Sequence, residues 1–492
     1  MLRSVSVAVL VFLASSAMEA QQRPVLAPVE RDGFTTLTSY ESLKSFVQSL
    51  GGASMKVSTI ATTRSGRSVF LVRYTSPQTP SRDSTLRVLL FAQQHGNEPS
   101  GKEAMTILLA RLASGALNDL KGPLELYIVP QMNPDGAELH QRWTSDSLDM
   151  NRTHLVLSTP EVGALHELFY AVKPHVTLDV HEFFAYSESW SDSGFVKMSD
   201  VQLGMLTNPN SSHALAAFQH TTVFPFVAHE MAMEGFLFQE YIVGSPSDRV
   251  RHSTTEINDG RQSFGILNTL SFIQEGREGK TSLENLERRT RSQLTGILAL
   301  LRCCTSHAKE IVDMVDRERV LLNHHVGDAC ALRMQHIAGD RRLIIPVRSL
   351  STGKDTTWLV TPYHSVVQTI CRTTLPRAYI VPKHCTSVIK LLEKHHVSFT
   401  VNKESKTIRA DRYMIDSVGW DALEEDTLPR PYAHLASEVV TLTDGDIIVP
   451  TAQWHSYFLA TLLEPESMWG LTKYPQYSWI LKNPLYPILR VP

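Results

Sequence analysis

The stretch LLFAQQHGNEPSG, residues 89–101, passes from an apolar run through a short polar loop into the start of a helix. The apolar run predicts a buried strand, and Pro99 is typical of a first helical turn. His95 and Glu98 therefore follow the carboxyl end of a strand, the edge at which open α/β sheets bind ligands. A histidine and a carboxylate three positions apart in such a loop can bind one zinc ion if one further protein ligand joins them.

Two other apolar runs end in side chains that suit the same edge. Residues 176–180 lead into His181, and residues 269–274 lead into Glu275. We expect His181 to complete the metal site, with water in the fourth position of a catalytic zinc. The chain has no His-Glu-x-x-His, no P-loop, no G-x-G-x-x-G and no G-x-S-x-G, which excludes the helical zinc peptidases and the common nucleotide and serine-hydrolase sites.

Apolar runs alternate with helical patterns through the first part of the chain. Expected strands lie at 56–61, 68–74, 86–92, 124–130, 176–180 and 269–274, and expected helices at 40–50, 101–112, 161–172 and 283–307. This alternation predicts an α/β fold with three α/β/α layers around a mostly parallel mixed sheet. The length of 492 residues exceeds one hydrophobic core. We expect a catalytic domain at 34–308 and a smaller C-terminal α+β domain at 310–492, including a strand, a helix and a strand at 378–401.

The first twenty residues predict a secretory signal peptide. Arg3 precedes an apolar run from Val5 to Ala14, and small residues allow cleavage after Ala17 or Ala20. The run is too short to span a bilayer, so we expect a secreted or periplasmic protein with no membrane insertion once the signal is removed. A formal net charge of -3 indicates no electrostatic partner such as nucleic acid.

The five cysteines all lie after residue 300 and have no Cys-x-x-Cys spacing, so they predict no zinc ribbon. They are Cys303, Cys304, Cys330, Cys371 and Cys385. An odd number leaves at least one thiol unpaired, and the sequence leaves open whether the others form disulfides or are buried thiols.

From about residue 34 to residue 304 the chain resembles the zinc carboxypeptidase family, because five motifs occur in that family's order. They are His95-Gly96-Asn97-Glu98, Asn133-Pro134-Asp135-Gly136, Asp149-Met150-Asn151-Arg152, the strand-end His181 and the strand-end Glu275. An Asp-x-His-Glu segment is similar to the bacterial branch. The resemblance implies Zn²⁺ at His95, Glu98 and His181. It also implies a metallocarboxypeptidase that acts on peptides or proteins with a free C-terminus.

The resemblance also implies roles for other residues. Glu275 corresponds to the base that activates water together with zinc, and Glu278 is its rival in the same segment. Arg142 corresponds to the arginine that stabilises the oxyanion, although stacking on Trp143 would also explain it. Asn151 and Arg152 correspond to the pair that binds the terminal carboxylate of the substrate, with a structural salt bridge as the alternative.

Asp149 corresponds to the carboxylate that accepts the ring N–H of His95, and helix capping is the alternative. The family also closes a mobile tyrosine over its substrate. Residues 257–264 contain no tyrosine, and Tyr241 lies earlier in the chain. Two other functions are compatible with the sequence: a zinc amidohydrolase acting on acyl-amino acids or cell-wall peptides, and a secreted binding protein with a degenerate enzyme fold.

Overall fold

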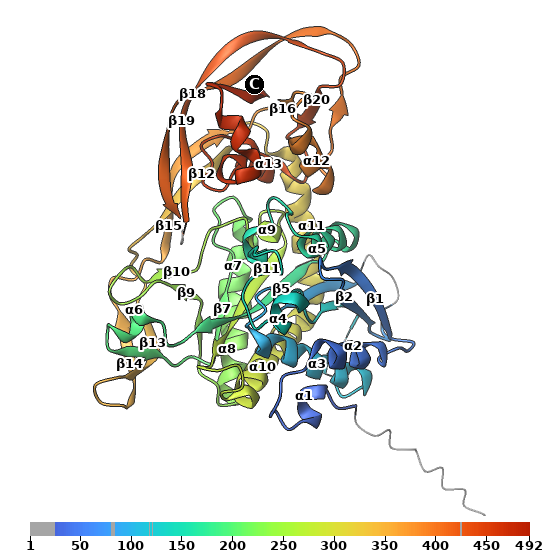
Figure 1. Ribbon diagram of the computed structural model, residues 1–492, viewed down its shortest axis with the longest axis vertical. Coiled ribbons are helices and arrows are strands. Elements are labelled where there is room, and N and C mark those ends of the chain that lie inside the picture. The colour runs from blue at the N-terminus through green and yellow to red at the C-terminus, as the bar shows by residue number, and fades with distance from the viewer. Residues whose placement is uncertain (1–24, 80–83, 118, 121, 424–425) are drawn as a thin grey trace, which may run out of the picture.

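The computed structural model describes residues 25–79, 84–117, 119–120, 122–423 and 426–492 (Figure 1). The expected signal peptide lies outside these residues. Two helices, α1 (Pro28–Arg31) and α2 (Tyr40–Gln48), precede the first strand. Within the described residues, no helix combines the length and the apolar character needed to cross a membrane.

An eight-stranded mixed sheet forms the centre of the first part of the chain, in the order β1-β2-β4-β3-β5-β11-β7-β8. Its strands are β1 (Met55–Thr62), β2 (Ser68–Thr75), β3 (Leu86–Ala92), β4 (Leu124–Val129), β5 (Val176–Phe184), β7 (Val201–Gly204), β8 (Phe238–Glu240) and β11 (Leu270–Glu278). Neighbours among β4, β3, β5 and β11 are parallel, and β1, β2 and β7 join antiparallel. Parallel strands are buried on both faces, which explains why they appear as continuous apolar runs.

Helices cover both faces of this sheet, which confirms the predicted α/β fold with a mixed sheet. One layer contains α3 (Pro99–Ala113), α7 (His213–Phe218), α8 (Phe224–Met233), α10 (Leu286–Ser306) and α11 (Ala308–Leu321), and the other contains α5 (Pro160–Val172) and α9 (Gln262–Gly265). Leu178 and Val180 of β5 pack in the first layer. Because side chains alternate along a strand, Asp179 and His181 point to the second layer.

Strand β5 continues four residues beyond the expected end at Val180. The polar pair His181 and Glu182 interrupts the apolar run, yet both side chains are buried. Glu182 is paired with Arg289 of α10 at 2.7 Å and accepts a hydrogen bond from the Ser100 hydroxyl at 2.7 Å. The strand therefore continues because tertiary partners satisfy side chains that would otherwise end it.

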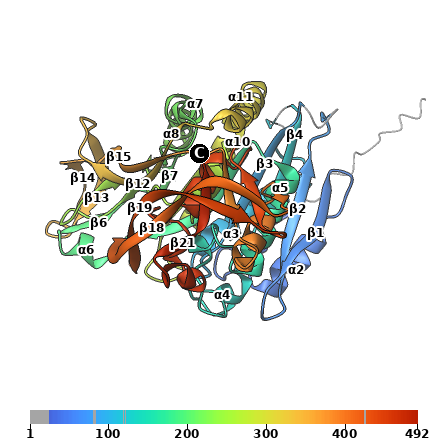
Figure 2. The same cartoon turned by 90° about the horizontal axis from the view of Figure 1, so that it is seen from above.

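The C-terminal part is rich in strands and carries a six-stranded sheet in the order β17-β20-β16-β21-β18-β19, which forms the upper part of Figure 1 and crosses over the first part in Figure 2. Its elements are β12 (Ala329–Ile337), β13 (Leu343–Ser349), β14 (Asp355–Val360), β15 (Val366–Thr374), β16 (Ala378–Val381), α12 (Thr386–Lys394), β17 (Thr400–Val401), β18 (Lys406–Leu423), β19 (Asp426–Leu442), β20 (Ile447–Pro450), α13 (Ser456–Leu463) and β21 (Leu485–Val491). The expected strand, helix and strand at 378–401 are β16, α12 and β17.

The two parts of the chain share structure across the expected boundary at 308–310. Helix α11 begins there and packs into the first core through residues such as Ile311. Strand β6 (Phe195–Lys197) pairs with β13 from the C-terminal part. A second core joins α5 and α9 to C-terminal side chains, with the Phe169 ring stacked 5.8 Å from Trp454. The division into 34–308 and 310–492 therefore stays a proposal about independent folding.

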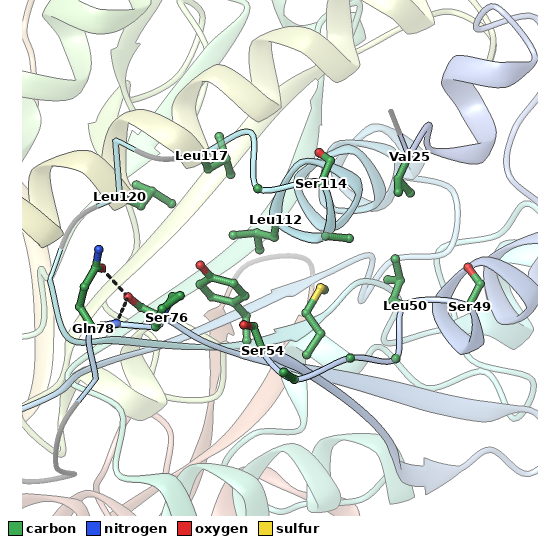
Figure 3. Close-up of a pocket in the computed structure, with 18 residues that line it drawn as sticks. Val25, Ser49, Leu50, Ser54, Ser76, Gln78, Leu112, Ser114, Leu117 and Leu120 are labelled. Carbon is green, nitrogen blue, oxygen red and sulfur yellow. Dashed lines mark hydrogen bonds between the residues drawn. The ribbon is translucent and has the colours of Figure 1, made fainter. Parts of the chain in front are cut away.

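All five cysteines are free thiols in this structure, and all but Cys371 are buried. A cavity of about 780 Å³ opens at the far end of α3 from the metal-ligand loop. Leu50, Leu112 and Leu120 are among its lining residues (Figure 3). Its lining contains none of the side chains predicted for the active site.

Candidate metal centre

Three predicted ligands converge at the carboxyl edge of the sheet. Nδ1 of His95 lies 2.7 Å from Oε1 of Glu98, and Nδ1 of His181 lies 3.0 Å from Oε2 of the same carboxylate. The two Nδ1 atoms are 3.1 Å apart. Within the described parts of the chain, no other group of three histidine, cysteine, aspartate or glutamate side chains brings its ligand atoms within 4.8 Å of one another.

The loop that carries His95 is held by close backbone packing. Gln93 has a left-handed φ of 57°, and a Cβ added to Gly96 would lie 2.1 Å from the carbonyl carbon of Gly136. Only glycine allows this approach. Asn133 donates from Nδ2 to the carbonyl of Gln94 at 3.1 Å. The Asn-Pro-Asp-Gly motif is therefore the support on which the metal loop rests.

A carboxylate holds the outer nitrogen of each histidine. Nε2 of His95 lies 3.1 Å from Oδ1 of Asp149, as the resemblance implied, and Asp149 also accepts from the backbone N–H of Asn151 at 2.9 Å. Asp149 thus makes both the expected contact and the capping contact. Nε2 of His181 lies 2.9 Å from Oδ1 of Asp179. Sequence reasoning missed Asp179, although residues two apart on one strand share a face.

The electrostatics of the centre suit a cation. Burial raises the pKa of Glu98, but the charge of His95 and the hydrogen bond to His181 lower it by more. The pKa therefore lies below its ordinary value, and the carboxylate stays ionised. Burial lowers the pKa of His181, whereas Asp179 and Glu98 raise it well above its ordinary value. Negative charge that favours a proton here also favours a metal ion. Two imidazoles and one carboxylate are a ligand set of catalytic zinc, so these residues fit zinc.

Arg142 points at the same centre. Its Nε donates to Oδ2 of Asp149 at 2.9 Å, and its Nη1 lies 3.1 Å from Nδ1 of His95 and 3.8 Å from Oε1 of Glu98. The guanidinium carbon also lies 5.8 Å from the ring centroid of Trp143. The charged end of Arg142 therefore lies next to the three predicted ligands and also near the Trp143 ring, which is compatible with both interpretations of Arg142.

Glu275 lies beside the three predicted ligands, on the strand next to that of His181. In the parallel pairing of β11 with β5, Glu275 stands opposite His181. Gln274 donates to the backbone carbonyl of Gln293 in the α10 layer, so Glu275 faces the other layer, as His181 does. Burial raises the pKa of Glu275 to about 7, with the charge of His181 acting in the opposite direction.

Glu278 lies three residues after Glu275 on β11, so its side chain points to the opposite face of the sheet. Its position matches the alternation of Gln274 and Glu182, whose side chains face the α10 layer. Burial and the charge of Glu182 raise the pKa of Glu278 to about 7 as well. The pKa values do not separate the two glutamates, but their orientations do.

Asn151 contacts Gln94 in the loop after β3, and Nη1 of Arg152 donates to the backbone carbonyl of Asn151 at 3.0 Å. Oδ1 of Asn151 accepts from the backbone N–H of Gly260 at 2.8 Å and from Nε2 of Gln94 at 3.3 Å. Nε2 of Gln94 also donates to Oδ2 of Asp179 at 2.8 Å. Sequence reasoning missed Gln94, because nothing local to it indicates that it joins the carboxylate behind His181 to the predicted substrate-binding pair.

The position of the expected closing tyrosine stays open. The ring of Tyr241 lies 5.9 Å from the guanidinium of the buried Arg261, so it packs within the domain. Tyr474, from the C-terminal part, is close enough to Arg152 for that charge to act on its hydroxyl, although burial raises the pKa of Tyr474 overall.

A comparison with protein families agrees with this geometry. The zinc carboxypeptidase family model matches residues 43–167, a segment that contains His95, Glu98, Asn151 and Arg152. Residues 43–167 of the chain are therefore similar to the zinc carboxypeptidases. His181 and Glu275 lie beyond the matched segment, and the fold brings them to it.

The chain is also similar to several known carboxypeptidases. It is 24% identical over 419 residues to carboxypeptidase 2 of Trichophyton tonsurans, covering 82% of this chain and 76% of that protein. It is 27% identical over 121 residues to carboxypeptidase E of Caenorhabditis elegans, covering 22% and 25% of the two chains. These similarities do not assign it to the bacterial branch.

Solved structures of metallocarboxypeptidases are also similar. A Pseudomonas aeruginosa metallo-carboxypeptidase in complex with (2-guanidinoethylmercapto)succinic acid matches at 22% identity and a TM-score of 0.42, covering 55% of this chain and 69% of that one. Carboxypeptidase A from Helicoverpa armigera matches at 15% identity and a TM-score of 0.42, covering 56% and 75%.

Proposed function

We propose that this carboxypeptidase hydrolyses the last peptide bond of substrates with a free C-terminus, using zinc and Glu275 to activate water. The observation that carries the proposal is the convergence of His95, Glu98 and His181, with Glu275 opposite His181 on the next strand. We also propose, from the first twenty residues, that it acts in a periplasm or outside the cell.

His95, Glu98 and His181 would hold the metal. When bound, zinc supplies a Lewis acid that polarises the scissile carbonyl and makes water more acidic. The Glu275 carboxylate takes a proton from the attacking water and then passes it to the leaving amine. Its buried position supports this role, because a carboxyl whose pKa is raised towards neutrality can both accept and release a proton near neutral pH.

Arg142 and Asp149 form a charged pair that supports the oxyanion role of the arginine. The hydrogen bond from Arg142 Nε to Asp149 orients the guanidinium, and Nη1 is left pointing towards the ligands. A preorganised cation at that position stabilises negative charge that develops on the carbonyl oxygen.

Asn151 and Arg152 are proposed to bind the terminal carboxylate of the substrate. A guanidinium can form two parallel hydrogen bonds to a carboxylate, which a neutral amide group at the end of a chain cannot match. Hydrogen bonds from Gly260 and Gln94 to Oδ1 of Asn151 hold this segment in place. Such a site restricts cleavage to the end of a chain.

The test compares N-blocked peptides that carry a free C-terminal carboxylate with the same peptides as amides and with acyl-amino acids. We expect release of the last residue from free peptides only. Arg152→Ala should raise KM for them on the order of tenfold or more, since it removes a charged hydrogen bond worth roughly 1.5–3 kcal/mol. Arg302→Ala is the matched control, because Arg302 forms surface ion pairs with Asp119 and Glu230 away from the site.

Three results would contradict the proposal. Equal cleavage of free and amidated peptides, with no effect of Arg152→Ala, would indicate an endopeptidase. Cleavage of acyl-amino acids alone would indicate the zinc amidohydrolase. Absence of bound zinc and of all hydrolysis would indicate a binding protein with a degenerate fold.

The identity of the base is tested by a pair of isosteric changes. Glu275→Gln should bind zinc normally and lose nearly all turnover, because an amide cannot accept the proton. Glu278→Gln should have a mild effect, since its side chain faces the α10 layer. The opposite pattern would assign the base to Glu278.

A further inference from the structure

Lys197 carries an ammonium group that the proposed reaction does not use. Its Nζ lies 4.5 Å from the ring centroid of Phe183 and 5.7 Å from that of Trp190. Among the residues that the structure describes, the contacts of this ammonium are with these two rings, and it has no hydrogen bond or ion pair. Burial lowers the pKa of Lys197 to about 8 and the charge of Glu275 raises it, so the group is mostly charged at neutral pH.

The residues of β5 that face the second layer place this cation relative to the metal centre. Asp179, His181 and Phe183 lie two apart, so each step along the strand is roughly 7 Å. Asp179 is joined through Gln94 to Asn151, His181 is a proposed metal ligand, and the Phe183 ring lies under Nζ of Lys197. The proposed carboxylate site, the metal site and the lysine therefore follow one another along one strand.

The C-terminal part of the chain holds Lys197 in this position. Lys197 belongs to β6 and pairs with Val347 of β13. The Trp190 ring, one of the two under Nζ, packs edge-on against Trp358 of β14 at 5.7 Å. Strands β13 and β14 do not belong to the eight-stranded sheet. The position of Lys197 therefore depends on pairing and packing with distant segments of the chain.

Two further cations lie over an aromatic ring beyond His181, in the region from Phe183 to Tyr186 and from Arg277 to Lys280 that is here called the rim. Arg277 stands opposite Phe183 in the β11–β5 pairing, and its guanidinium lies 5.8 Å from the ring of Tyr186. Nζ of Lys280 lies 4.8 Å from the same ring. An ammonium partly removed from water and without a contacting anion gains free energy when a ligand supplies a carboxylate.

We propose that Lys197 binds an acidic side chain on the substrate residue immediately before the cleaved bond, so that the enzyme prefers peptides with aspartate or glutamate there. The inference rests on the proposed function. The order of sites along β5 places the residue before the cleaved bond near Lys197 only if Asn151 and Arg152 hold the terminal carboxylate. A peptide advances about 3.3–3.6 Å per residue. With its terminus at Asn151 and its scissile carbonyl at the metal, the preceding residue reaches the Phe183 side.

The test uses three N-blocked peptides that share a free C-terminal residue and differ before it, with Glu, Gln or Ala. We expect wild type to cleave the Glu peptide with a kcat/KM on the order of tenfold or more above that of the Gln peptide. Lys197→Met keeps the length of the side chain without its charge, and the ratio should fall to about one. Lys197→Arg should keep most of the preference.

Lys173→Met is the matched control, because Lys173 also lies over a tryptophan ring, 5.7 Å from Trp454, but outside this rim. It should keep the wild-type ratio. Zinc content and thermal melting of each variant report whether the fold is intact.

Each other outcome has a defined meaning. A wild-type Glu-to-Gln ratio near one, with normal cleavage of all three peptides, overturns the role of Lys197 alone. An equal loss on all three peptides in Lys197→Met, with a shifted acid limb of the pH profile, means that Lys197 acts through Glu275, and the recognition proposal is wrong. No cleavage of any free peptide overturns the proposed function and the lysine assignment together.

Discussion

Asp179→Asn should weaken zinc binding without unfolding the protein. The carboxylate lies 2.9 Å from Nε2 of His181 and accepts from Gln94 at 2.8 Å, so it orients the ligand and raises its basicity. Asparagine keeps the shape but offers one acceptor oxygen and no charge, so His181 or Gln94 loses its partner. Loss of a charged contact worth roughly 1.5–3 kcal/mol corresponds to about a 10- to 100-fold increase in the zinc Kd.

The assay is competition for zinc between the metal-free protein and a chromophoric chelator at fixed pH and ionic strength. Asp149→Asn, which makes the equivalent change behind His95, should give a loss of similar size. Asp119→Asn removes a surface carboxylate paired with Arg302 and should leave the zinc Kd unchanged. A wild-type zinc Kd in folded Asp179→Asn would refute the reasoning, because His181 would then be oriented without its carboxylate.

Three further results are expected. The kcat/KM of the enzyme should fall on the acid side, because protonated Glu275 cannot act as a base; its pKa of about 7 sets the upper limit of that limb, and bound zinc moves it to lower pH. A profile that stays flat down to about pH 5 would contradict this. Gly260→Ala should weaken zinc binding, since the added Cβ would lie 2.5 Å from Oδ2 of Asp179. Gly163 lies in an open helical position, so Gly163→Ala should raise Tm by adding about 0.5–1 kcal/mol to the free energy of unfolding. A chain that ends at Ala308 should give little soluble, zinc-binding protein, because it loses β13 and the partners of the second core. A soluble and active truncation would show that residues 34–308 fold alone.

Local sequence was sufficient for the strands that carry the centre. The expected strand at 86–92 has the observed bounds of β3, because parallel strands buried on both faces appear as continuous apolar runs. From their positions after such runs, His95, Glu98, His181 and Glu275 were predicted to meet at one edge of the sheet, and the structure brings them together there. Each of these residues is recognised by what precedes it in the chain, so no knowledge of distant segments was needed.

Other features had no local signal. The strand containing His181 was expected to stop at Val180, since neither the partner of Glu182 nor the metal site is visible in a linear pattern. Asp179 and Gln94 become meaningful only when the neighbouring strands are in register. The same register separates Glu275 from Glu278, because it decides which side chain faces the ligands.

The sequence by itself therefore determined the α/β fold and the chemical types assembled at the strand ends. Only the tertiary structure decided how these side chains are oriented and what joins them from elsewhere. Lys197 shows the reason most clearly: its strand is positioned by pairing with β13, far along the chain. Strand pairing between distant segments depends on the register and packing of the whole fold, and neither is encoded in the few residues on either side of the lysine.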